Sequence, residues 1–218
     1  MFCMDPPIPN PPAMPREPLK KWFVVFTGLS GTGKDTASMA VMQNSGTAYR
    51  AEICKFSQPM KVAIATLLDV PVDYLEDRNY RNKVIPQLGV TPLDLMVRSF
   101  DFLPSLHPDI CTYRTEQYLE SRLKAAKKFN HVVVFNDVRQ QKEAELLVRL
   151  ADAHQYDMLT IHIKRQGTQP LSSDIHCQAI TDYLAYHSRR MFVVFNNWEI
   201  SILESRVLRM LHAVSILP

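Results

Sequence analysis

The sequence predicts an α/β protein in which a mainly parallel sheet is flanked by helices. Short apolar runs alternate along the chain with segments whose apolar residues recur at helical spacing, an order typical of strand–helix–strand units. Residues 22–27 and 131–135 are almost continuously apolar, as expected for strands buried on both faces of a sheet. Ligands bind beyond the carboxyl ends of such strands, so the residues that follow each run are the first candidates for function.

The remaining elements are predicted from spacing and from helix-start signals. Further strands are expected at 50–56, 158–163 and 191–195, and helices at 34–43, 58–68, 92–100, 109–129, 139–151 and 198–214. A short helix is expected after the polar loop 164–174. Thr91 and Pro92 provide an N-cap followed by proline at the first helical position. In the last helix, Leu203, Val207 and Leu211 share one face.

Composition excludes several classes of protein. The 218 residues are 46% hydrophobic and 22% charged, which is ordinary for a globular chain and not for a disordered or fibrous one. Purely apolar stretches reach only about five residues, too few to span a bilayer. A net charge of +3 gives no argument for binding to nucleic acid or membranes. The four cysteines show no CxxC spacing and no signal peptide is recognised, so we expect a reduced, cytoplasmic protein.

One domain over residues 21–218 is expected, preceded by a proline-rich arm over residues 1–20. The arm holds seven of the 15 prolines, at positions 6, 7, 9, 11, 12, 15 and 18. Proline fixes its own φ and lacks an amide donor, so helix and central strand are both excluded there. A solvated, extended arm is the favoured interpretation, and a partner-binding segment is the alternative.

A glycine-rich turn joins the first strand to the first helix. Residues 28–34 fit the pattern G-x-x-x-x-G-K in the strand–turn–helix context that a phosphate-binding loop requires. Its amides and the helix N-terminus favour an anion, and the lysine would reach the β- and γ-phosphates. The candidate nucleotide-binding residues are therefore Gly28, Ser30, Gly31, Thr32, Gly33 and Lys34.

Two residues after this lysine need separate interpretation. Asp35 stands where the strict motif has Ser or Thr, and Thr36 follows it. We expect Thr36 to contact phosphate or magnesium. Asp35 is a candidate for nucleotide binding and catalysis if it meets a metal, a basic residue or the acceptor; otherwise it is a first-turn acid that the helix dipole favours.

Several segments resemble one enzyme family. Residues 33–36, Gly-Lys-Asp-Thr, resemble the Ser-Gly-Lys-Asp-Thr loop of the deoxynucleoside monophosphate kinases of tailed phages. Residues 56–61, 89–92 and 136–144 resemble, in the same order, its Phe-Ala-x-Pro-Leu-Lys, Gly-x-Thr-Pro-Arg and Asp-Val-Arg-x-x-x-Glu-Ala segments. These short matches extend over about residues 22–214. There are two departures: Leu93 stands where the family often has arginine, and residues 174–178 lack the glutamate of its lid motif.

The resemblance implies a three-layer P-loop nucleoside monophosphate kinase-like fold with a mostly helical acceptor-binding region near 71–115 and a lid near 164–176. Asp137 follows the strand 131–135, so it is expected to organise magnesium with Thr36, or to cap the next helix. Arg139 and Arg165 are expected to act on the transferring phosphoryl group. The candidates for binding substrate are Lys61, Arg98, Arg114, Asp137 and Arg139, and Asn197 is the candidate for the adenine of ATP. For each basic residue the alternative is a solvated surface position.

The function that follows is transfer of phosphate from ATP·Mg²⁺ to a deoxynucleoside 5′-monophosphate, in the cytoplasm, or in the host cytoplasm if a phage encodes the chain. ATP and Mg²⁺ are the expected cofactors. No nucleic acid or membrane partner is expected, and a homodimer stays open. The alternatives are a phosphomevalonate- or dephospho-coenzyme A-type kinase, and a non-catalytic ATP-binding regulatory module.

Overall fold

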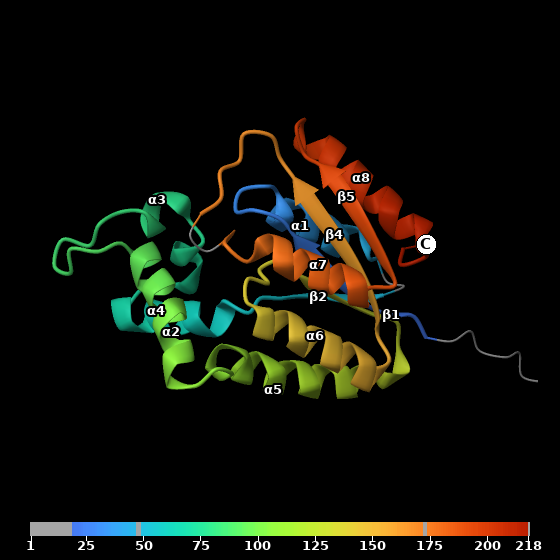
Figure 1. Ribbon diagram of the computed structural model, residues 1–218, viewed down its shortest axis with the longest axis horizontal. Coiled ribbons are helices and arrows are strands. Elements are labelled where there is room, and N and C mark those ends of the chain that lie inside the picture. The colour runs from blue at the N-terminus through green and yellow to red at the C-terminus, as the bar shows by residue number, and fades with distance from the viewer. Residues whose placement is uncertain (1–18, 47–48, 172–173, 218) are drawn as a thin grey trace, which may run out of the picture.

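The computed structural model describes residues 19–46, 49–171 and 174–217, and within them the fold is α/β as predicted (Figure 1). The strands are β1 (Lys21–Thr27), β2 (Arg50–Cys54), β3 (His131–Phe135), β4 (Asp157–Lys164) and β5 (Arg190–Phe195). They form one sheet in the order β2-β3-β1-β4-β5, and every pairing is parallel. The carboxyl ends of β1, β2 and β3 therefore meet at one edge.

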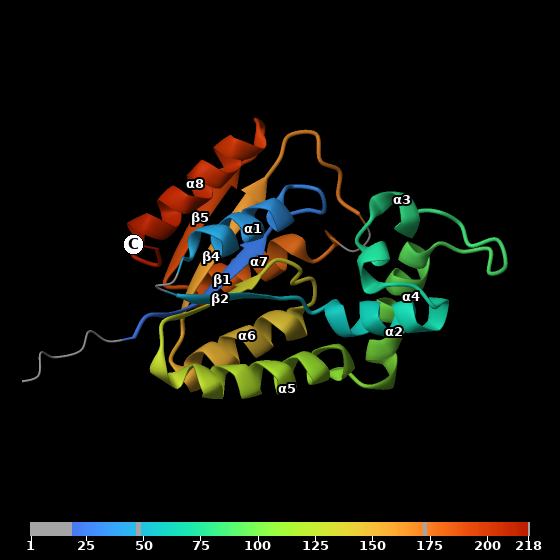
Figure 2. The ribbon, with the colours of Figure 1, turned by 180° about the vertical axis from the view of Figure 1, so that it is seen from behind.

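Helices cover both faces of this sheet. One face packs against α1 (Lys34–Asn44) and α8 (Ile200–Ala213); the other packs against α5 (Ile110–Ala125), α6 (Gln141–His154) and α7 (Cys177–His187). Figures 1 and 2 show these two layers from opposite sides. Strand β1 alternates between the layers, because Phe23 and Val25 lie in one apolar core and Val24 and Phe26 in the other. The sheet is thus the middle of three layers.

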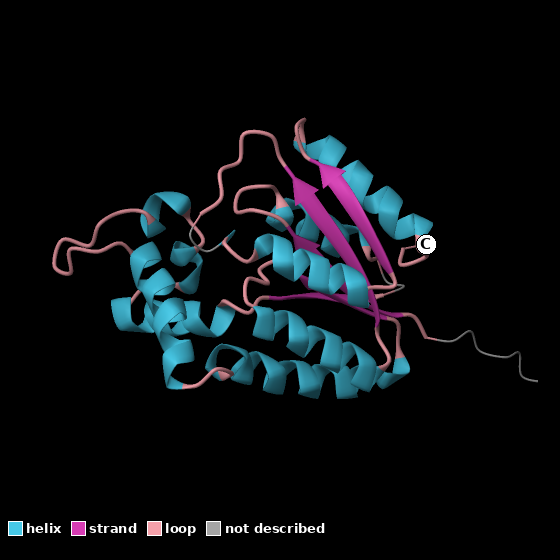
Figure 3. Cartoon of the chain, in the orientation of Figure 1, coloured by secondary structure: helices cyan, strands magenta, loops and turns pink. Residues whose placement is uncertain are grey.

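A helical lobe lies beside the sheet (Figure 3). It consists of α2 (Gln58–Leu68), the short helices η1 (Val72–Leu75) and α3 (Arg78–Arg81), and α4 (Pro92–Leu106). Its own small core is formed by Ile64, Ala65, Leu75 and Met96. This lobe contains most of the region that the sequence suggested for an acceptor.

The predicted elements agree closely with the observed ones. The main difference is α4, which continues past residue 100 to Leu106 and includes Pro104 in its last turn. Helix α5 ends at Ala125 and a single 3₁₀ turn, η2 (Ala126–Lys128), leads to β3. Thr91 caps α4 as expected, in a reciprocal capping box with Asp94.

The proposed arm lies outside the described residues except for its last two. Lys20 is already part of the fold, because its N–H donates to Asn130 Oδ1 at 2.9 Å and its carbonyl accepts from His131 N. Among the helices of the described residues, none is long and apolar enough to cross a membrane.

Candidate functional site

The glycine-rich turn between β1 and α1 has the backbone of a tight anion-binding loop. Gly28, Gly31 and Gly33 have φ values of 128°, 82° and 104°, a region that L-residues rarely occupy. The loop ends at the N-terminus of α1, where unpaired amides and the helix dipole favour negative charge. The sequence motif and the backbone geometry therefore agree.

The loop is held closely against the sheet. A Cβ at Gly28 would overlap the Ile163 carbonyl of β4, and a Cβ at Gly33 would lie 2.5 Å from Asn196 Nδ2. That buried Asn196 amide donates to the Thr32 carbonyl at 2.8 Å. Glycines at these two positions thus let the loop rest directly on the ends of β4 and β5.

Lys34 curls back over this loop. Its Nζ donates to the carbonyls of Gly28 and Leu29 at 2.6 and 2.8 Å. Burial, and the nearby Arg139 guanidinium, lower the pKa of Lys34, although the Asp174 carboxylate opposes the shift. The cation is half-buried and would gain from an anion that enters the loop.

An acid from the loop between β4 and α7 occupies this region. Asp174 Oδ2 accepts from Ser30 N at 3.0 Å, and its Oδ1 accepts from Ser30 Oγ at 3.1 Å and lies 3.8 Å from Arg139 Nη1. Burial opposes ionisation, but these hydrogen bonds and Arg139 keep the pKa of Asp174 below its usual value. The cavity at this point is about 10 Å³ and is lined by Gly28, Lys34, Asp137, Val138, Arg139, Asp174 and Cys177. It holds about one water molecule, so it is too small for a phosphate group while Asp174 lies on Ser30.

We expect Asp174→Asn to tighten ATP binding several-fold, because it removes a negative charge that competes with the triphosphate at the loop. Isothermal titration calorimetry with ATP would measure the change. Asp182→Asn, an exposed acid on α7, is the matched control and should leave the affinity unchanged. A tenfold weaker affinity in Asp174→Asn would instead show that this carboxylate supports the binding-competent loop.

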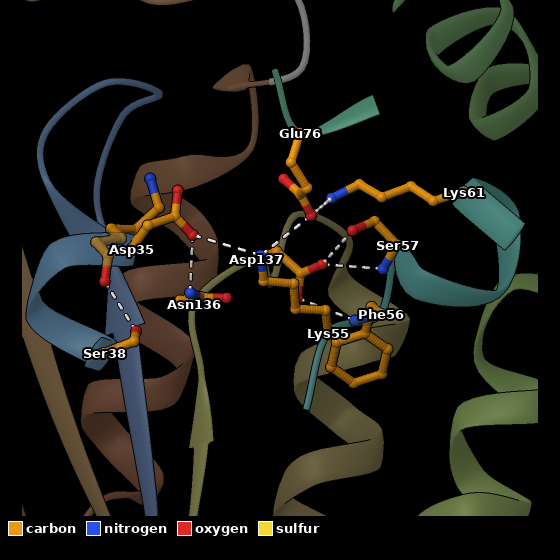
Figure 4. Close-up of polar contacts among 10 residues, drawn as sticks. Asp35, Ser38, Lys55, Phe56, Ser57, Lys61, Glu76, Asn136 and Asp137 are labelled. Carbon is orange, nitrogen blue, oxygen red and sulfur yellow. Dashed lines mark hydrogen bonds and ion pairs between the residues drawn. The ribbon is translucent and has the colours of Figure 1, made fainter. Parts of the chain in front are cut away.

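Asp137 lies at the same sheet edge and already accepts three hydrogen bonds. Its carboxylate accepts from Phe56 N at 2.9 Å, Ser57 N at 2.9 Å and Ser57 Oγ at 2.7 Å (Figure 4). Asp137 thereby ties the start of α2 to the end of β3. Its predicted part in magnesium binding stays a prediction, and both of its oxygens already serve these three donors.

A chain of alternating charges runs from the loop to the helical lobe (Figure 4). Lys55 Nζ lies 3.7 Å from Asp35 Oδ1 and 3.2 Å from Glu76 Oε1, and Lys61 Nζ lies 2.6 Å from the same Glu76 oxygen. Burial lowers the pKa of Lys55, but Glu76 and Asp35 outweigh this effect and raise it. Lys55 therefore stays a cation beside the loop. The sequence interpretation missed Lys55, because the strand was predicted over 50–56 and β2 ends at Cys54, directly before Lys55.

The structure brings some of the predicted residues together and leaves others apart. Lys34, Asp35, Asp137 and Arg139 gather at the ends of β1 and β3, and Lys61 joins them through Glu76. Thr36 lies in the first turn of α1, and Asn197 Oδ1 accepts from Gln166 N at 2.8 Å. In the described part of the chain, no hydrogen bond or ion pair connects the glycine-rich loop with three exposed arginines, Arg98, Arg114 and Arg165.

Glu143 supports the segment that carries Arg139. Its buried Oε2 accepts from Arg139 N at 2.6 Å and from Gln140 N at 3.0 Å. Burial, and the nearby Asp137 carboxylate, raise the pKa of Glu143 from 4.5 to about 8. The folded protein therefore holds this proton more tightly than the unfolded chain does.

The free energy of unfolding should consequently fall as the pH rises from 4.5 to about 8, by up to about 1.4 kcal/mol per pH unit from this group. Glu143→Gln keeps a neutral acceptor for both amides and should lose this dependence. Urea unfolding of both proteins at pH 5 to 8 measures the difference. Parallel pH profiles would show that Glu143 is ionised throughout.

Comparisons with known proteins identify no family for the chain. No family model and no curated protein matches it. Solved structures that resemble it include a protein from Chloroflexus aurantiacus provisionally described as a kinase (TM-score 0.46, 11% identity, covering 89% of this chain and 98% of that one). Others are a gluconokinase from Sinorhizobium meliloti (0.40, 10%, 90% and 95%) and Chaetomium thermophilum Kti12 in complex with ADP-AlF3 (0.41, 9%, 88% and 97%). These identities and TM-scores are too low to support an argument about the site. The description of the site therefore rests on the chain's own sheet order and loop geometry.

Proposed function

We propose that this chain transfers the γ-phosphoryl group of ATP to a small acceptor, and that the acceptor is a deoxynucleoside 5′-monophosphate. The observation that carries the proposal is the loop 28–33. It has left-handed glycines and the N-terminus of α1, and the half-buried Lys34 cation lies over it. Phosphoryl transfer requires mainly alignment and neutralisation of charge, and Lys34, Lys55 and Arg139 lie at this edge of the sheet.

The roles of the residues follow from their places. The loop amides and Lys34 would bind the β- and γ-phosphates, and Arg139, which lines the same cavity, would meet the group in transfer. A bound magnesium ion would neutralise charge between these phosphates. The loop between β4 and α7, which bears Arg165 and Asp174, would close over the nucleotide and exclude water.

The acceptor is assigned to the helical lobe formed by α2, η1, α3 and α4. Lys61 and Lys55 bring positive charge from this lobe and from the end of β2 toward the loop. Arg98 and Arg114 lie exposed on α4 and α5, where they are proposed to reach the acceptor phosphate once substrate is bound. The choice of a deoxynucleoside monophosphate rests on the family resemblance of the loop and of the segment 136–144.

A coupled ADP-release assay over all common nucleoside and deoxynucleoside monophosphates tests this function. We expect turnover above the ATP hydrolysis background with one or more of the deoxynucleotides. Phosphomevalonate, dephospho-coenzyme A and gluconate serve as competing acceptors in the same assay. Turnover with one of these alone would replace the proposed substrate, and ATP binding without turnover on any acceptor would favour a regulatory module.

A further inference from the structure

Asp35 and Asn136 occupy positions that are important in any phosphate-binding loop. In the strict motif, the residue after the lysine is a Ser or Thr whose hydroxyl binds Mg²⁺. A carboxylate at the end of a neighbouring strand completes the magnesium shell. Here Asp35 follows the lysine, and Asn136 directly follows β3, the strand beside β1. Relative to the strict motif, a carboxylate follows the lysine here and a neutral amide follows the neighbouring strand.

The two side chains are in direct contact. Asn136 Nδ2 donates to Asp35 Oδ1 at 2.9 Å. Figure 4 shows the Asn136 nitrogen directed at the Asp35 carboxylate and the Asn136 oxygen on the other side of the amide. The amide nitrogen must face the Asp35 carboxylate, since the reverse orientation would place two acceptors together. The orientation of the Asn136 oxygen is therefore fixed by its neighbour.

That Asn136 oxygen is buried and has no partner. Asn136 is 4% exposed, and its Oδ1 accepts no hydrogen bond within the described residues. An orphaned buried acceptor costs about 1–3 kcal/mol, and a cation or a bound water beside it would remove this cost. A ligand bound between the loop and the end of β3 would satisfy this atom.

Asp137, the other carboxylate at the end of β3, is less suitable as a magnesium ligand. Both Asp137 oxygens already accept hydrogen bonds, from three donors on residues 56 and 57, and a metal ion would compete with these donors. By contrast, the Asp35 side chain is 83% exposed and already lies beside a cation, Lys55. No cluster of three or more His, Cys, Asp or Glu side chains suited to a metal occurs in the described ranges. Mg²⁺ does not need one, because it commonly takes one or two protein oxygens and completes its shell with phosphates and water.

We infer that Asp35 and Asn136, and not Asp137, supply oxygen ligands to the magnesium that accompanies ATP. The inference rests on the proposed use of ATP and specifies the metal subsite of that function. The Asp35 carboxylate supplies the charge, and Asn136 Oδ1 supplies a neutral oxygen. The hydrogen bond between them holds the pair in place.

Calorimetry of ATP binding with Mg²⁺ and with EDTA tests the assignment without using turnover. In the wild type, Mg²⁺ should tighten ATP binding by about tenfold or more. Asp35→Asn should reduce this gain to near unity while free ATP binds at least as tightly as before. Electron paramagnetic resonance of Mn²⁺ with ATP provides a second readout, and the variant should release Mn²⁺ from the ternary complex.

Three further variants make the test specific. The exchange variant Asp35→Asn/Asn136→Asp returns a carboxylate to the pair and should restore most of the Mg²⁺ gain. Asp137→Asn should keep the gain, although its melting temperature should fall because α2 loses an anchor. Asp152→Asn, an exposed acid on α6, is the matched control for the removed charge and should match wild type.

The outcomes separate the two proposals. A full Mg²⁺ gain in Asp35→Asn, or its loss in Asp137→Asn alone, overturns the ligand assignment and leaves the kinase proposal standing. Failure of the wild type to bind ATP under either condition overturns the kinase proposal, and the ligand assignment with it.

Discussion

Replacing Lys34 with alanine is expected to lower kcat by about three orders of magnitude. The lysine lies over the glycine-rich loop, where its Nζ donates to the Gly28 and Leu29 carbonyls. Removing one preorganised group that meets charge developing in the transition state typically costs a factor of about 10²–10³, and under the proposed function Lys34 would also bind the ground-state phosphates. The coupled ADP-release assay with the best acceptor would measure the loss.

The fold should survive this substitution. The two hydrogen bonds of Lys34 contribute about 1 kcal/mol each, and losing them is partly offset because the cation is poorly solvated where it lies, as its lowered pKa shows. Lys142→Ala, an exposed lysine on α6, is the matched control and should keep full activity. A Lys34→Ala enzyme within threefold of wild type would remove Lys34 from the mechanism.

The sequence was sufficient for the elements but not for their arrangement. Strands such as 131–135 are continuous apolar runs and so were predicted directly, and Thr91-Pro92 correctly marked the start of α4. The order β2-β3-β1-β4-β5 depends on which apolar surfaces meet across the core, and no local pattern contains this information. The short helices η1 and α3 were not predicted because each is a single turn.

The residues of the site show the same contrast between local motifs, which the sequence predicts, and long-range contacts, which it does not. The glycine-rich loop is a local motif, and its positive φ values occur where the glycines indicated. Asp174 reaches Ser30 across 144 residues, and Asn136 reaches Asp35 across 101, so neither contact leaves a trace in spacing. Lys55 was missed for a local reason: the strand was predicted two residues too long, so the strand-end rule that selected Asp137 passed over the residue after Cys54.

Gly28→Ala is expected to cause the largest loss of stability among single loop substitutions. The position has a φ of 128°, which costs an L-residue about 1–3 kcal/mol. The new methyl group would also overlap the Ile163 carbonyl and lie 3.1 Å from Thr32 Oγ1. Ile163 belongs to β4, which is paired on both sides, so that carbonyl cannot move without disturbing the sheet. The total cost should be about 3 kcal/mol or more.

Gly89→Ala separates the two causes of this loss. Gly89 also has a positive φ, 66°, but a Cβ there would meet open space, so it should cost only about 1–2 kcal/mol of backbone strain. Thermal unfolding should place Gly28→Ala several degrees below Gly89→Ala, at about 2–4 °C per kcal/mol for a chain of this size. Gly28→Ala should also lose ATP binding, because the loop must lift from β4 to make room. Equal melting temperatures would mean that the loop can shift freely, and a rigid, preformed phosphate cradle would then be the wrong description of this site.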